Sequence, residues 1–86
     1  MTAAMEFTAE ELDTLRVALL SAHYDALDEE RALRGRVAEL DSYRSEGHAI
    51  VGRDEAEDSR AKAALRAMAY HLLVERVMAE RQKMPL

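Results

Sequence analysis

Apolar residues recur at steps of three and four through the first half of the chain, which places them on one face of a helix. This stripe comprises Leu12, Leu15, Leu19, Ala22 with His23, Ala26, Leu33, Val37, Leu40 and Tyr43. Thr8 and Glu11 form a capping-box pattern, and Phe7 with Leu12 fits a hydrophobic staple. The pattern predicts one helix over about residues 8–44, roughly 55 Å long at 1.5 Å per residue.

A second helix is predicted over about residues 54–82. Asp54 and Glu57 form another capping-box pattern, and the acids of the first turn complement the helix dipole. Pro85, the only proline, lies just beyond the predicted end. The stripe that faces the core is predicted at Ala61, Ala64 with Leu65, Met68, His71 with Leu72, Glu75, Met78 and Ala79.

The glycines mark the connection between these helices. The chain contains three glycines, and Gly47 and Gly52 lie between the two helical patterns. A turn is therefore predicted over about residues 45–53, with Gly47 at the helix C-terminus and the apolar pair Ile50–Val51 covering the hairpin end. The expected fold is all-α: one domain over residues 1–86, built as an antiparallel helical hairpin. A break near Gly35 would instead give a three-helix bundle.

A hairpin that turns near residues 49–50 brings Leu33 opposite Arg66 and leaves the segment from Phe7 to Leu15 uncovered. A second stripe on the first helix, Val17, Leu20, Tyr24 and Leu27, widens its apolar face further. Exposed apolar patches of this kind mark interfaces, and twofold dimers are the commonest assemblies. We therefore expect a homodimer that forms a four-helix bundle. The predicted interface residues are Phe7, Leu12, Leu15, Leu19, Leu20, His23, Tyr24 and Leu27.

Composition and net charge argue against several classes of protein. The chain has 86 residues, no cysteine and a net charge of −5, so disulfides are excluded and direct nucleic-acid binding is disfavoured. Residues 1–6 lack the pattern of a signal peptide, and no apolar stretch approaches the ~20 residues of a membrane span. A cytoplasmic protein is the expectation.

The sequence contains few residue patterns that are typical of catalytic or metal-binding sites. His71 and Glu75 share a helix face at a spacing of four, and the predicted pairing sets His71 opposite Asp28. With His23 they suggest a metal-binding bundle, but the Glu-x-x-His and HExxH patterns are absent, so we predict no metal site. No nucleophile elbow or phosphate-binding loop occurs, so no catalytic residue and no cofactor are predicted.

The leading expectation is a small non-enzymatic module for protein–protein interaction and oligomerisation, whose partner is a second copy of itself. An alternative is an acidic inhibitor or regulator that captures a larger basic protein, such as a nucleic-acid enzyme. Its binding patch would be Asp25, Asp28, Glu29 and Glu30. A metal-binding helical bundle is the third reading.

Overall fold

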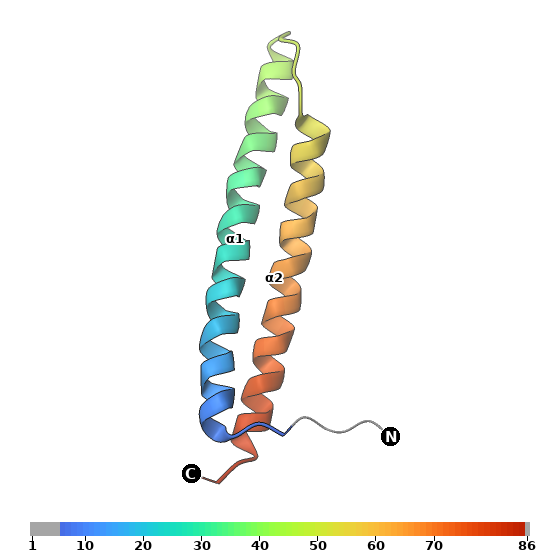
Figure 1. Cartoon of the computed structure of the whole chain (residues 1–86). Coiled ribbons are helices and arrows are strands. Elements are labelled where there is room, and N and C mark those ends of the chain that lie inside the picture. The colour runs from blue at the N-terminus through green and yellow to red at the C-terminus, as the bar shows by residue number, and fades with distance from the viewer. Residues whose placement is uncertain (1–5, 86) are drawn as a thin grey trace, which may run out of the picture.

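Two long helices pack against each other as an antiparallel hairpin in the computed structural model, which describes residues 6–85 (Figure 1). Helix α1 spans Ala9–Ser45 and α2 spans Arg53–Gln82. The rod measures 62 × 30 × 14 Å. The predicted hairpin is confirmed, and each helix bound lies within one residue of its prediction. The absence of a signal peptide was predicted from a segment that lies almost wholly outside the described residues.

Helix α1 runs through Gly35 without a break, so the alternative of a three-helix bundle is wrong. Gly35 is exposed, and no neighbouring atom lies within 4 Å of the position where a Cβ would stand. Val37 and Leu40 continue the buried stripe beyond it. Glycine costs a helix about 1 kcal/mol relative to alanine, and burial of these two side chains outweighs that cost.

Both ends of α1 are closed by the residues that the sequence indicates. The Thr8 hydroxyl accepts from the Glu11 N–H at 3.1 Å, while the Glu11 carboxylate accepts from the Thr8 N–H at 2.9 Å. That backbone N–H lowers the pKa of Glu11. At the other end Gly47 adopts φ 90°, and its N–H donates to the Arg44 carbonyl. The His48 N–H donates to the Tyr43 carbonyl, which completes a Schellman motif.

The start of α2 differs from the prediction. Gly52, at φ 85°, is the N-cap residue and no side chain caps the helix, so the predicted Asp54–Glu57 capping box is wrong. Arg53 is instead the first helical residue, and two hydrogen bonds of 3.0 and 3.2 Å tie its guanidinium to Asp41 on α1. Because the helix begins one residue early, Glu57 is free to accept from Arg60.

The seam between the helices repeats every seven residues. Its α1 side is formed by two columns, Leu12, Leu19, Ala26, Leu33 and Leu40 beside Arg16, His23, Glu30 and Val37. Its α2 side is formed by Ala56, Ala63, Tyr70 and Val77 beside Arg60, Ala67, Val74 and Arg81. All of these residues are buried or half-buried. A sustained seven-residue repeat is the geometry of a left-handed coiled coil.

The predicted core stripe of the second helix is wrong by one position. Leu65, Met68 and Leu72 are 66%, 62% and 57% exposed, whereas Ala63 and Ala67 are buried. Alanine lets the α2 backbone approach α1 closely, where the leucines of α1 fill the space. The larger side chains of α2 are thereby left on the outside.

The register of the hairpin also differs from the prediction. Arg66 bonds Glu29, one helical turn before the predicted Leu33, and Arg81 bonds Asp13 at 3.2 Å. The chain reverses at Gly47, earlier than predicted, and runs back beside α1 before α2 begins (Figure 1). Helix α2 therefore reaches the N-terminal turn of α1. The predicted uncovered overhang is wrong, because Leu12 is only 3% exposed; its ends at Phe7 and Leu15 are half-buried.

Candidate interaction surface

One side of the hairpin carries a strip of exposed and half-buried apolar side chains, which we call the apolar flank. On both helices its residues follow the seam columns by one position. Leu27 of α1 and Ala64 and Met68 of α2 line one shallow groove of about 350 Å³ on this side. The members of the apolar flank are Val17, Leu20, Tyr24, Leu27, Ala64 and Met68, while Leu65 and Leu72 are exposed on the face of α2 that points away from α1 and border the flank.

The opposite side of the hairpin has a different character. An ion pair between Glu29 and Arg66, at 2.8 Å, crosses the seam there. At seven-residue steps from this pair lie Arg36 and Tyr43 on α1 and Leu73 on α2, and Tyr43 and Leu73 are exposed. An ion pair therefore occupies the middle of this side, whereas the middle of the apolar flank is apolar and its charged residues lie toward the ends.

The predicted interface residues are divided between three places. Leu20, Tyr24 and Leu27 lie on the apolar flank. His23 stands at the inner edge of that flank and lines its groove. Leu12 and Leu19 are seam residues, and the half-buried Phe7 and Leu15 line a groove at the start of α1. The sequence pattern does not identify the second-helix half of the flank as surface, because it assigns Ala64 and Met68 to the core. The seven-residue spacing of Ala56, Ala63, Tyr70 and Val77 is the signal that identifies the true seam.

A buried carboxylate anchors the middle of the seam. Glu30 is buried and accepts from Arg34 at 2.6 Å and from Arg60 at 3.2 Å. Burial raises the pKa of Glu30, but the hydrogen bonds from the two arginines outweigh burial and leave the pKa below its usual value. Hydrogen bonds from Arg60 also lower the pKa of Glu57. This cluster links the two helices. The buried carboxylate is paired with two guanidinium groups, which a buried ion needs in order to be stable.

The acidic quartet proposed for a basic partner does not form one open patch. Glu30 is buried in the seam, Glu29 bonds Arg66 and Asp28 lies 4.0 Å from Arg31. Asp25 is exposed on the side away from the flank groove. Capture of a basic protein through these acids stays a prediction.

His23 of α1 and His71 of α2 lie beside each other. The rings of His23 and His71 lie 5.6 Å apart, so the predicted pairing of His71 with Asp28 is wrong. His23 Nδ1 lies 2.8 Å from the Ala67 carbonyl oxygen and donates to it, since a carbonyl only accepts. His71 Nε2 lies 3.1 Å from Glu75. Among residues 6–85, no three His, Asp or Glu side chains are placed so as to hold a metal ion.

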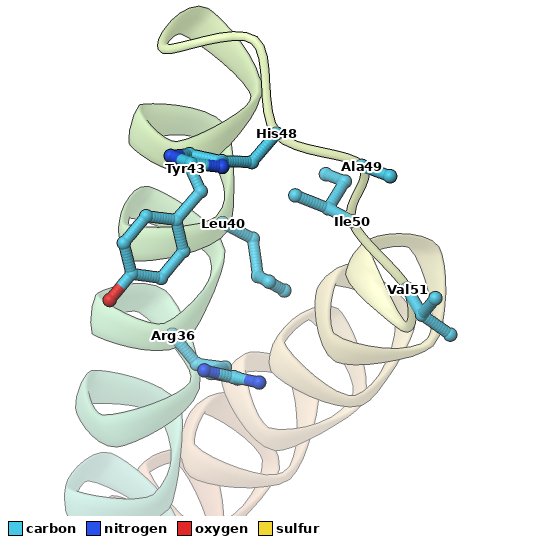
Figure 2. Close-up of a pocket in the computed structure, with 7 residues that line it drawn as sticks. All are labelled: Arg36, Leu40, Tyr43, His48, Ala49, Ile50 and Val51. Atoms are coloured by element: carbon cyan, nitrogen blue, oxygen red, sulfur yellow. The ribbon is translucent and has the colours of Figure 1, made fainter.

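A second groove, of about 480 Å³, lies at the tip of the hairpin (Figure 2). Arg36, Leu40 and Tyr43 line it from α1, and the segment 48–51 lines it from the connection. Figure 2 shows Ile50 directed toward Leu40, while Val51 points away; Val51 is 89% exposed. Ile50 alone thus helps to cover the hairpin end, and the predicted contribution of Val51 is wrong.

Comparisons with known proteins do not assign the chain to a family. No protein family, no curated protein and no solved structure matches the chain. Within the described part of the chain, neither helix combines the length and apolar character needed to cross a membrane.

Proposed function

We propose that this protein is a non-enzymatic interaction module that associates with a second copy of itself through the apolar flank. The observation that carries the proposal is the apolar flank, where the exposed Val17, Tyr24 and Met68 lie beside the groove that Leu27 and Ala64 line. Single exposed apolar residues are ordinary on protein surfaces, but a contiguous strip rimmed by charges is typical of an interface. The two halves would together form a four-helix bundle.

Burial of the apolar flank would offset much of the cost of association. Full burial of one Val, Leu or Met side chain is worth about 1.5–3 kcal/mol. Val17, Tyr24 and Met68 are each more than half exposed, so two copies contribute six such side chains. Burial of roughly half of each gives about 5–9 kcal/mol, which is comparable with the ~4–15 kcal/mol cost of bringing two molecules together. Packing of Leu20 and Leu27 adds to this.

Light scattering coupled to size exclusion, from low to high micromolar concentration, tests the proposal. The expected mass is twice that of the chain. Met68→Glu places a charge in the middle of the apolar flank and should convert the dimer to a monomer while circular dichroism retains the helical signal. Ala32→Glu is the matched control and should remain dimeric, because Ala32 is exposed and its helix neighbours Asp28, Glu29, Gly35 and Arg36 lie outside the apolar flank. A monomeric mass for the unaltered protein at every concentration would refute self-association.

A further inference from the structure

We propose that the two copies pack antiparallel, α1 against α1 and α2 against α2, with Tyr24 beside the twofold axis. This orientation rests on the proposed self-association and goes beyond it, because a dimer could also form with both hairpins pointing the same way. The two arrangements place different residues in contact. The charges along the apolar flank distinguish between them.

The decisive pattern is one seven-residue column on α1. Asp13, Leu20, Leu27, Arg34 and Asp41 follow one another at this spacing, so they form a single line along the flank. Asp41 is bonded to Arg53 of its own copy. The remaining four residues place an acid at one end, a base at the other and two leucines between. When a second copy is laid against it in reverse direction, Leu20 meets Leu27, and Asp13 meets Arg34. The column is therefore complementary to its own reversed copy, as a twofold interface requires.

Both terminal charges can take part in such contacts. The side chains of Asp13 and Arg34 are 50% and 69% exposed. Asp13 uses one oxygen toward Arg81, and Arg34 uses Nε and one terminal nitrogen toward Glu30. The second carboxylate oxygen and the remaining guanidinium nitrogen are available for a partner, because both groups can form several hydrogen bonds.

The neighbouring columns fit the same axis. On α1, Val17 and Arg31 lie equally far from Tyr24, so Tyr24 faces its own copy and each Arg31 reaches over the smaller Val17. On α2, Ala61 and Glu75 lie equally far from Met68. Met68 then faces its own copy, while the short side chain of Ala61 leaves Glu75 a path to water. The ring contact of His23 with His71 shows that Tyr24 and Met68 stand at nearly the same height along the rod.

The parallel arrangement lacks this match. A twofold axis along the rod lays α1 of one copy over α2 of the other at the same height. Asp13 would then meet the region of Met78 and Gln82 of the second copy, where the nearest arginine, Arg81, already bonds that copy's own Asp13. Arg34 would lie near Glu57 of the second copy, which already bonds Arg60. Glu75 would lie over Val17 of the second copy, where a carboxylate is costly to bury. The antiparallel arrangement is favoured because it pairs Asp13 with Arg34 and sets Glu75 opposite the short side chain of Ala61.

Distances between spin labels decide the orientation. The chain contains no cysteine, so Ala49→Cys provides a single label at the hairpin tip. In the antiparallel dimer the two tips lie at opposite ends, each about 32 Å from the axis at 1.5 Å per residue, so the expected separation is ~65 Å. In the parallel dimer the tips are neighbours, and the labels should lie within roughly 30 Å, given helix spacings of 8–10 Å.

Asp25→Cys is the matched control, because it lies near the axis and outside the flank. Its labels should be within about 35 Å in either dimer, so this signal reports association alone. A long tip distance with a short Asp25 distance supports the proposal. Short distances at both positions overturn the antiparallel orientation and leave self-association standing. A monomeric mass with no distance between copies overturns both proposals and leaves the apolar flank to a different protein.

Discussion

Leu12 provides the sharpest test of the register of the hairpin. If the chain reversed near residues 49–50, Leu12 would lie beyond the reach of α2, and its replacement by alanine would change stability little. In the structure α2 reaches the N-terminal turn of α1, and Leu12 is 3% exposed beside Val77 and Met78. Leu12→Ala therefore removes buried carbon atoms and leaves a cavity, which costs 2–5 kcal/mol in protein cores. We expect about 3 kcal/mol.

Urea unfolding followed by far-ultraviolet circular dichroism measures this change, with all variants compared at one protein concentration because association affects apparent stability. Leu40→Ala, at an equally buried seam position, should cost a similar amount. Leu65→Ala makes the same chemical change at a 66% exposed position and should cost well below ~1 kcal/mol. A loss below ~1 kcal/mol for Leu12→Ala, with Leu40→Ala behaving as expected, would refute the register.

Three further predictions concern the glycines and the carboxylates. Gly35→Ala should raise the free energy of unfolding by up to about 1 kcal/mol, since the helix has open space for the methyl group; a decrease in the urea midpoint would contradict this. Gly52→Ala should lower it by roughly 1–2 kcal/mol because φ is 85° there, and an unchanged midpoint would show that the left-handed conformation is not needed. The pKa values of Glu30 and Asp41 are lowered in the folded state, so their contribution is complete above their unfolded values near 4 and is lost as the pH falls below them. Urea midpoints measured between pH 7 and pH 2.5 should fall mainly below pH 4, and a flat profile there would contradict these ion pairs.

Features that depend on neighbouring residues in the chain were predictable. The capping box at Thr8 and the left-handed Gly47 depend on groups within a few positions, and both formed as expected. The continuity of α1 through Gly35 was also readable, because no turn-forming residue stands beside that glycine. The start of α2 was less predictable, since Arg53 joined the helix while bonding Asp41, which is distant in sequence. Asp13 and His23 posed the same difficulty, because their partners, Arg81 and the Ala67 carbonyl, lie on the other helix.

The sequence by itself determined two long helices, their caps and the antiparallel hairpin, because periodicity, capping and glycine conformation act over one or two turns of backbone. Only the tertiary structure decided which side of α2 faces α1 and how far the helices overlap. Several stripes of α2 carry enough apolar residues to face α1, so local sequence did not distinguish between them. The stripe with Ala63 and Ala67 faces α1 because these small side chains let the backbones approach closely. That choice buried Leu12 and left Leu65, Met68 and Leu72 outside, and it thereby created the apolar flank on which the proposed association depends.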